Sequence, residues 1–439
     1  MKIYTYPSRS AETRLSRIVN RDLGFRRKDL AQVRKILETV RKDGDEAVVR
    51  YTRQFDAPKL KPDQLRVADQ EIKSATKKVG RAFLRSLQRA ADQIRSFHAK
   101  QMPRSWVDTP REGTLLGQLI RPVDAAGVYV PGGKSGNTPL VSSVLMGAIP
   151  ARIAGVPRVV MATPPMADGS VSPHLLAAAA QAGVDDIYKM GSAWAIGALA
   201  YGTRTIPKVD VIVGPGNVYV TLAKKLVAGS VKIDMIAGPS EILVIADGQA
   251  DADFVAADML SQAEHDVLAS AILVTDSGEL ARKVQQSLQR QVTGLARHVI
   301  AEQSLASFSA LFVVPDLDTA LELANRIAPE HLELIIDNPM DHLGRLRHAG
   351  AVFIGSHTPE PVGDYVAGPN HVLPTSGTAR FSSALSVEHF LKKTSLIRYS
   401  PEAFKAEAGD IIRLAEVEGL GAHAQAVRLR LEKAGKKKQ

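Results

Sequence analysis

AGVYV, residues 126–130, opens the stretch of sequence that decides the fold, because it is the first of four short apolar segments in a row. The others are RVVMA (158–162), DDIYKM (185–190) and DVIVG (210–214). The intervals are long enough for helices, as in VSSVLMGAIPARIAG (141–155). Buried strands that alternate with helices predict a parallel sheet with crossover helices on its faces.

A second series of strand-like segments repeats this pattern downstream. Its members are EILVIADG (241–248), SAILVTD (270–276), ALFVVPD (310–316), LELIID (332–337) and AVFIG (351–355). Helical periodicity fills the intervals, as in LDTALELANRIA (317–328). We therefore predict an α/β fold with two Rossmann-like parallel-sheet units, incomplete and non-standard, and with helical N- and C-terminal segments.

The composition restricts the chemistry. The 439 residues include no cysteine, which excludes a disulfide framework, a thiol nucleophile, an iron–sulfur cluster and cysteine-ligated zinc. A metal site must therefore use His, Asp, Glu or Gln. Pro, Gly or Arg interrupts the apolar stretches before they reach membrane-spanning length, and the start MKIYTYPSRS lacks a signal-peptide pattern. We expect a cytoplasmic protein without a membrane partner.

The net charge of +10 makes nucleic-acid binding an alternative. Much of the excess lies near the ends, in residues 14–53 and in the tail that contains Lys436, Lys437 and Lys438. No zinc-knuckle, RNP-like or GXXG signature accompanies these charges. A solvated helix face and a frayed tail are therefore the favoured interpretation, and we predict no nucleic-acid partner.

Two glycine-rich turns follow strand-like segments, GVYVPGGKSGN (127–137) and VDVIVGPGNVYV (209–220). Ligands bind at the carboxyl edge of parallel sheets, where a turn that enters a helix offers its backbone N–H groups to phosphate. Neither turn contains G-x-G-x-x-G, and glycine is equally expected in ordinary turns. The residues alone leave both interpretations open.

Two pairs of polar residues are candidates for chemistry. Gln262 and His265 are three apart in a helical pattern, so they could share a metal or simply form a polar helix face. Glu330 and His331 form an acid–imidazole pair at the start of a strand-like run, where neighbours point to opposite faces. The alternative for this second pair is a loop cap.

The polar segment 362–383 has neither helical nor strand periodicity, and long polar loops inside compact proteins are often functional. It contributes Asp364 and His371 as potential ligands or acid–base groups. EGLGAHA, near the end, contributes Glu418 and His423 at a helix break. Each of these residues, taken alone, is equally an ordinary surface residue.

Seven segments in order resemble the histidinol dehydrogenase family. They are GVYVPGG (127–133), VGPGNVYV (213–220), IDMIAGPSEILVIAD (233–247), LSQAEHD (260–266), APEHLEL (328–334), GDYVAGPNHVLPTSGTARFSS (363–383) and EGLGAHA (418–424). The resemblance covers nearly the whole chain, and several long motifs in order are far more specific than any single one.

The resemblance implies one zinc ion per subunit and an acid–base pair. The implied zinc ligands are Gln262, His265, Asp364 and His423. Such a mixture of nitrogen and oxygen ligands suits zinc and agrees with the absence of cysteine. The implied acid–base pair is Glu330 and His331.

The resemblance also implies substrate and cofactor contacts. The substrate contacts are Ser240, Gln262, His265, His331, Asp364, Glu418 and His423. The NAD contacts are Tyr129 and Asn217. Trp194 stands where many members of the family have Gln, and it offers a stacking face but not the amide's paired donor and acceptor.

The reaction that the resemblance implies is the four-electron oxidation of L-histidinol to L-histidine through L-histidinal, with two NAD+, as the last step of histidine biosynthesis. Members of the family are homodimers in which the C-terminal motif reaches the neighbouring site. A relative that oxidises a sulfonated propanediol, and a zinc hydrolase, are the competing interpretations. Carboxylates near the zinc favour a cationic amino alcohol over a sulfonate, and the lack of HExxH argues against the hydrolase.

These inferences predict four regions of the chain. They are an N-terminal segment (1–25) that could pack on a partner subunit, a first α/β unit with a helical lead-in and most of the metal site (26–128 with 240–378), a second α/β unit with the NAD-side glycine turns (129–239), and a C-terminal helical segment (379–439).

Overall fold

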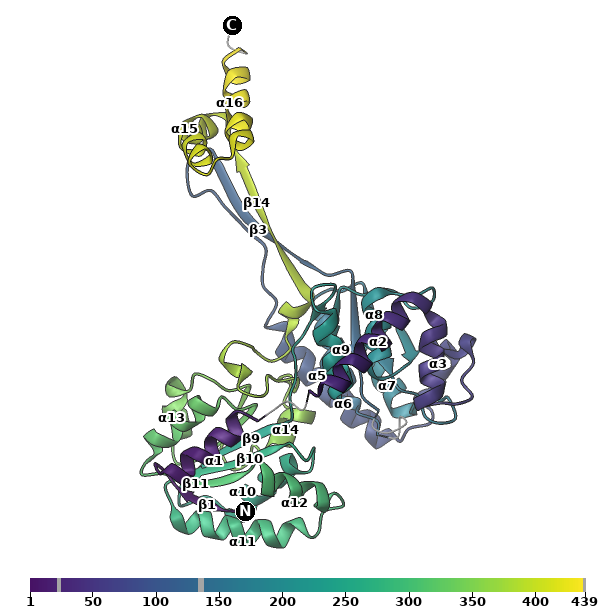
Figure 1. Ribbon diagram of the computed structural model, residues 1–439, viewed down its shortest axis with the longest axis vertical. Coiled ribbons are helices and arrows are strands. Elements are labelled where there is room, and N and C mark those ends of the chain that lie inside the picture. The colour runs from purple at the N-terminus through teal and green to yellow at the C-terminus, as the bar shows by residue number, and fades with distance from the viewer. Residues whose placement is uncertain (22–24, 133–137, 437–439) are drawn as a thin grey trace. The chain divides into compact units, whose positions relative to one another are not determined.

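The structure is a computed structural model that describes residues 1–21, 25–132 and 138–436 (Figure 1). The chain forms two compact units. The first unit comprises Met1–Gln101 and Val123–Phe390, and the second comprises Met102–Pro122 and Leu391–Gln439. The first unit contains both parallel sheets, which we call sheet A and sheet B.

Sheet B has five parallel strands in the order β6-β5-β4-β7-β8. The strands are β4 (Ala125–Tyr129), β5 (Arg158–Thr163), β6 (Asp186–Lys189), β7 (Val211–Val213) and β8 (Lys232–Ile233), and the helices between them are α6 (Val141–Ile153), α7 (Pro173–Ala182), α8 (Ser192–Tyr201) and α9 (Val218–Val227). The chain moves outward from β4 to β6 and then returns to the other side of β4 as β7. This reversal is the topological switch of a Rossmann-like sheet.

Sheet A has six parallel strands in the order β1-β11-β10-β9-β12-β13. The strands are β1 (Ile3–Thr5), β9 (Glu241–Ala246), β10 (Ser270–Thr275), β11 (Ala310–Val313), β12 (His331–Ile335) and β13 (Ala351–Ile354), and the helices are α1 (Arg9–Val19), α10 (Ala252–Ala263), α11 (Gly278–Val292), α12 (His298–Ser307), α13 (Leu317–Ile327) and α14 (Glu360–Tyr365). Its switch lies between β9 and β12. The prediction of two Rossmann-like parallel-sheet units is confirmed.

The central strand β9 explains why sheet A is covered on both faces. Successive residues of a strand point to opposite faces, so a run of apolar residues such as 242–246 of β9 must be covered on both faces of the sheet. Leu243 belongs to a core that includes Leu15 of α1 and Leu321 of α13. Val244 belongs to a different core, which includes Met259 of α10. Since Leu243 and Val244 are adjacent in β9, the two cores lie on opposite faces of the sheet.

The helical lead-in differs in position from the predicted grouping. It comprises α2 (Arg27–Asp43), α3 (Asp45–Phe55), α4 (Asp69–Ala75) and α5 (Arg81–Ala99), with a 3-10 turn, η1 (Pro62–Gln64). We expected it to join the later strands, but α2 and α3 share a core with α8 and α9 of sheet B. Periodicity identifies the apolar face of a helix but not the sheet that covers it.

The first residues of the chain pack on sheet A. β1 pairs in parallel with β11, and α1 buries Ala11, Leu15 and Ile18. These contacts lie within one chain, so packing of residues 1–25 on a partner subunit stays a prediction. None of the helices in the described part of the chain combines the length and hydropathy that a bilayer crossing requires.

The second unit contains a strand that the expected C-terminal helical segment did not include. β14 (Leu391–Tyr399) pairs antiparallel with β3 (Thr114–Pro122), and β3 pairs with β2 (Trp106–Asp108). The prediction of a purely helical C-terminal segment is therefore wrong at β14. Most of this strand is exposed, so its sequence LKKTSLIRY carries no alternating apolar face. The helices α15 (Pro401–Val417) and α16 (Gly421–Lys436) follow as expected.

Short 3-10 turns complete the fold at η3 (Pro339–Arg345), η4 (Thr378–Arg380) and η5 (Val387–Phe390).

Candidate functional site

The candidate residues of the acid–imidazole pair lie at the amino edge of sheet A. β12 begins at His331, directly after Glu330, and β9 begins at Glu241, directly after Ser240. The two strands are parallel neighbours with His331 opposite Ile242, so their first residues share one edge. Ligands of open α/β sheets usually bind at the carboxyl edge. This site is therefore not at the standard place for the fold.

One hydrogen bond determines the tautomer of His331. Its Nδ1 lies 2.9 Å from the main-chain oxygen of Glu241. A carbonyl oxygen can only accept, so Nδ1 carries the proton and Nε2 keeps a free lone pair when the ring is neutral. Burial lowers the pKa of His331 to about 4, which keeps the ring neutral near pH 7. Nε2 is thus a fixed proton acceptor.

Glu330 lies on the Nδ1 side of the His331 ring. Its Oε2 accepts a hydrogen bond from the main-chain N of Glu241 at 2.9 Å and lies 3.6 Å from Nδ1 of His331. The two side chains are close but share no direct hydrogen bond, as expected for neighbours in an extended segment. Burial raises the pKa of Glu330 well above its ordinary value. The pair therefore combines a neutral base with a carboxyl group that retains its proton strongly.

A cluster of ligand-type atoms surrounds Nε2 of His331. The candidate atoms of His331, Glu360 and Asp364 all lie within 4.8 Å of one another, with Glu360 Oε1 3.8 Å from Nε2. A cavity of about 120 Å³ adjoins this cluster and is lined by His331, Phe353, Asp364, Asn370 and His371, among others. One imidazole and two carboxylates at this separation could hold a divalent cation.

The environment of Asp364 favours its charged form. Burial alone would raise the pKa of Asp364, but the interaction with Nδ1 of His371, 3.6 Å away, holds that pKa below the ordinary value. Burial and the neighbouring Asp364 raise the pKa of Glu360 to about 8. Near pH 7 the two carboxyl groups on α14, four residues apart, therefore carry about one negative charge, which resides mainly on Asp364.

Gln262 lies in the last turn of α10, and His265 lies just beyond the end of that helix. Gln262 is 1% exposed, and its Oε1 is buried without a hydrogen-bond partner among the described residues. Buried amide oxygens are normally satisfied, so this one is suited to an external partner. His265 is exposed and near enough to His331 to contribute to lowering the pKa of that ring.

α10 and α14 are held side by side at this point, because Oγ of Ser261 donates to Glu360 Oε2 at 3.5 Å. Gln262 directly follows Ser261 in the chain. The structure therefore brings the end of α10 to the start of α14, which carries Asp364.

Three buried carboxylates of this region were absent from the sequence-based set. They are Glu241, Glu333 and Glu360. Glu333 Oε1 accepts the main-chain N–H of Glu360 at 2.9 Å, at the first turn of α14. The spacing of Glu360 and Asp364, four residues apart, is the one signal in the sequence that could have identified a member of this group.

Two predicted site residues belong to the second unit. Glu418 is the C-cap of α15, and His423 lies in the first turn of α16. Both side chains are exposed. Their roles as substrate contact and zinc ligand stay predictions.

The carboxyl edge of sheet B carries the predicted cofactor residues. Tyr129 ends β4, and Asn217 follows β7, on the two strands that flank the topological switch. Asn217 Oδ1 accepts hydrogen bonds from the N–H groups of Tyr219 (3.0 Å) and Val220 (3.2 Å), so it caps α9. Tyr129 is buried, and its hydroxyl accepts a hydrogen bond from Ser192 N at 3.0 Å. Part of the first glycine-rich turn, residues 133–137, lies outside the described residues.

Trp194 is a residue of α8, and its side chain is buried in the hydrophobic core beside sheet B. It is 4% exposed, its Nε1 donates to Thr52 Oγ1 at 3.1 Å, and it stacks on the rings of Tyr51 and Phe55 at centroid distances of 5.8 and 5.4 Å. Neighbours within the chain thus occupy much of the stacking surface that the sequence suggested for a cofactor. A contact of Trp194 with NAD stays a prediction.

Comparisons with known proteins agree with one another. A family model described as histidinol dehydrogenase matches residues 22–431. The chain is 58% identical over 399 residues to a histidinol dehydrogenase of Oleidesulfovibrio alaskensis, covering 91% of this chain and 92% of the relative. It is 54% identical to one of Heliobacterium mobile over 99% and 100% of the two chains. A crystal structure of histidinol dehydrogenase from Elizabethkingia anophelis superposes with a TM-score of 0.92 at 37% identity, over 99% of each chain.

Proposed function

Since the chain belongs to the histidinol dehydrogenase family and is therefore an oxidoreductase, we propose that it oxidises L-histidinol to L-histidine through L-histidinal, with one zinc ion per subunit and two NAD+ per turnover. The observation that carries this proposal is the state of His331. Its Nδ1 donates to a main-chain carbonyl, which leaves Nε2 as a neutral base 3.8 Å from Glu360, and His331 lines the cavity.

The residues of the first unit fit a zinc ion. Gln262 supplies a buried amide oxygen that has no hydrogen-bond partner in the described part of the chain, and Asp364 supplies a carboxylate that is held in its charged form. His265 supplies an exposed imidazole near His331. These three donors, with His423 as the fourth, form a mixed nitrogen and oxygen set of the kind that zinc accepts. Bound there, zinc would polarise the substrate hydroxyl and orient its imidazole and amine.

The switch of sheet B fits a dinucleotide. Tyr129 and Asn217 flank it, and the N-terminus of α9 directs backbone N–H groups to the same edge. NAD+ would serve as the electron acceptor in both oxidations. The glycine-rich turn at Gly214 adopts a φ of +117° and approaches Tyr129 so closely that an added Cβ would lie 2.1 Å from its main-chain oxygen. This close approach keeps the two cofactor-side segments together.

The chain's own groups supply the proton transfers. His331 Nε2 accepts the proton that the substrate hydroxyl releases in the first oxidation, passes it to solvent, and then accepts the proton that the hydrate hydroxyl releases in the second oxidation. Because its raised pKa makes its carboxylate a stronger base than an ordinary one, Glu330 in its ionised form accepts a proton from the water that adds to the aldehyde, which forms the hydrate that the second oxidation consumes. Retention of the aldehyde between the two steps allows one site to perform both oxidations.

We also propose that the protein acts as a homodimer and that His423 and Glu418 reach the site of the neighbouring subunit. Large apolar side chains exposed on the second unit support a partner there, since they would otherwise remain in water. They include Trp106, Ile397, Leu414 and Val417, of which Val417 is 82% exposed.

Replacement of His331 with Asn tests the assignment of roles. The Asn amide can donate to the main-chain oxygen of Glu241 but cannot take a proton, so NAD+ reduction with L-histidinol should fall by about 10²- to 10⁴-fold, the usual contribution of a general base. The zinc content per subunit, measured by elemental analysis, should stay at the parent value. Loss of zinc from this variant would identify His331 as a ligand and contradict the proposed division of roles.

Asp364→Ala is the matched control. It should lose zinc together with activity, because a charged ligand is removed. Retention of both metal and activity would remove Asp364 from the ligand set. An unmodified protein that reduces NAD+ with a sulfonated propanediol but not with L-histidinol would overturn the proposed substrate.

A further inference from the structure

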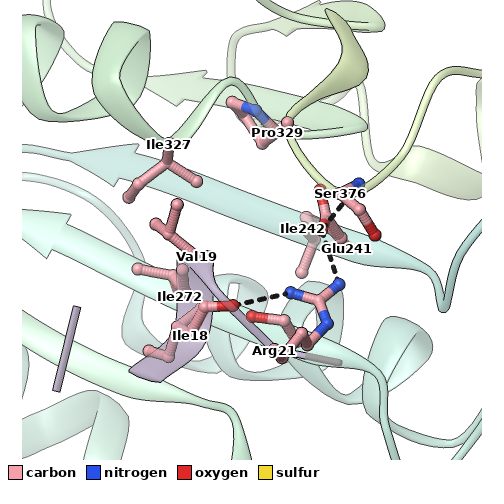
Figure 2. Close-up of a pocket in the computed structure, with 11 residues that line it drawn as sticks. Ile18, Val19, Arg21, Glu241, Ile242, Ile272, Ile327, Pro329 and Ser376 are labelled. Atoms are coloured by element: carbon pink, nitrogen blue, oxygen red, sulfur yellow. Dashed lines mark hydrogen bonds and ion pairs between the residues drawn. The ribbon is translucent and has the colours of Figure 1, made fainter. Parts of the chain in front are cut away.

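A buried ion pair lies behind the proposed acid–base pair. Arg21 Nη2 contacts Glu241 Oε1, and the two side chains are only 3% and 7% exposed. The guanidinium is fixed further by main-chain oxygens, since Nη2 donates to Pro239 at 3.2 Å and Nη1 donates to Ile18 at 3.4 Å. Figure 2 shows Arg21 at the wall of a small pocket, directed toward Glu241, with Ser376 on the far side of that carboxylate.

Glu241 connects this ion pair to both proposed catalytic residues. Its main-chain N donates to Glu330 Oε2 at 2.9 Å, and its main-chain oxygen accepts from His331 Nδ1 at 2.9 Å. Its own carboxylate accepts from the main-chain N of Glu330 at 3.3 Å and of Ser376 at 3.0 Å. A shift of the main chain at Glu241 would therefore move the contacts of both the Glu330 carboxyl group and the His331 ring, and the carboxylate of Glu241 holds that main chain in place through Arg21 and the N–H groups of Glu330 and Ser376.

Stability alone gives little reason for an ion pair at this place. Taking both charges out of water costs several kcal/mol per ion, and apolar replacements of buried ion pairs are often as stable or more stable. An ion pair does fix the orientation of its two side chains, because a guanidinium and a carboxylate bind in a narrow range of geometries. The strictest geometric requirement nearby is that of the proposed acid–base pair.

We propose that Arg21 is a positioning residue for the oxidation: through Glu241 it holds His331 and Glu330 in the orientation that proton transfer needs. The inference rests on the proposed function. It gives the N-terminal segment a role in turnover, since β1 and α1 dock on sheet A and carry Arg21 to Glu241, 220 residues away in sequence.

The test is Arg21→Met, with Arg14→Met as the matched control. Met keeps much of the length of Arg but removes its charge and its directed hydrogen bonds. Arg14 also anchors α1, because its guanidinium donates to the main-chain oxygens of Ser309 and Ala306, but it makes no contact with Glu241. Misplacement of reacting groups by about 1 Å can cost about 10²-fold in rate.

We expect Arg21→Met to lower kcat by about 10- to 100-fold. The zinc content should stay at the parent value, because Arg21 and Glu241 are not among the proposed zinc ligands, and the KM for L-histidinol should change much less than kcat, because His331 is one of several proposed substrate contacts. Arg14→Met should keep kcat within about twofold of the parent. A kcat of Arg21→Met equal to that of Arg14→Met would overturn the inference.

A double variant separates positioning from loss of fold. Arg21→Met leaves the Glu241 carboxylate buried without its partner, so the variant could unfold for that reason alone. Arg21→Met with Glu241→Gln removes both charges and should regain the parent melting temperature while kcat stays low. Recovery of kcat together with the melting temperature would show that the pair only stabilises the fold. A parent protein that does not oxidise L-histidinol would overturn the proposed function and, with it, this inference.

Discussion

At the scale of single residues, Trp194 illustrates how a side chain suggested for a ligand is used by the fold. Its indole packs between Tyr51 and Phe55, and its N–H is satisfied by Thr52. The sequence showed an aromatic residue in a segment that resembles a cofactor-binding motif. It could not show that two other aromatic rings, some 140 residues earlier, cover the indole.

We expect Trp194→Phe to lower the free energy of unfolding by about 1–3 kcal/mol, because Thr52 loses its partner in a buried place and the smaller ring leaves a void. The KM for NAD+ should change by less than about twofold. Thr52→Val is the control, since it removes the same hydrogen bond without touching the indole. A rise of about tenfold in the KM for NAD+ in Trp194→Phe alone would show that this residue contacts the cofactor.

Residue types and motifs predicted Gln262, Glu330, His331 and Asp364, and the structure places all four in the first unit. They did not predict Glu241, whose role depends on contacts with Arg21 and Ser376. These partners come from segments with unrelated local patterns, and only the packing of α1 and of the 366–386 loop on sheet A brings them together. Local periodicity contains no information on such contacts.

At the scale of secondary-structure elements, the sequence predicted buried strands well and exposed ones poorly. The strands of sheet A and sheet B are apolar because helices cover both faces, so their residues stand out from the helical intervals. β14 and β2 have few buried residues, and their sequences give no such contrast. The same reason explains why the helix α14 was expected to be loop: it has six residues and one buried side chain.

The N-terminus of α9 offers a test at this scale. Asn217 caps the helix through Oδ1 and is also the proposed NAD contact. Asn217→Ala should lower the free energy of unfolding by about 1 kcal/mol, the usual cost of losing an N-cap. It should also raise the KM for NAD+.

Asn217→Asp separates these two effects. Asp caps helices as well as Asn does, so stability should stay at the parent value, while its charge should repel the cofactor's pyrophosphate and raise the KM for NAD+. An unchanged KM for NAD+ in both variants would remove Asn217 from the proposed cofactor contacts.

At the scale of the whole molecule, the proposed dimer can be tested by complementation. His331→Asn and His423→Ala should each be inactive alone. If His423 serves the neighbouring subunit, a mixed dimer has one site with both lesions and one site with neither. Random mixing of equal amounts should then restore about a quarter of the parent activity, because half of the dimers are mixed and each has one intact site.

The two proteins must be co-expressed with different tags, so that the mixed dimer can be purified and assayed. If His423 served its own subunit, both sites of the mixed dimer would carry a lesion and no activity would return. A monomeric protein with full activity would contradict the proposed assembly.

The pairing of β1 with β11 has one more consequence for the molecule. β1 is the outermost strand on that side of sheet A, and its three residues cover the main-chain groups of β11. A sheet margin without such cover offers its free N–H and C=O groups to any extended peptide and promotes aggregation. Removal of the first five residues should therefore expose β11 to self-association, and a longer deletion that also removed Arg21 should lose the contact with Glu241 as well.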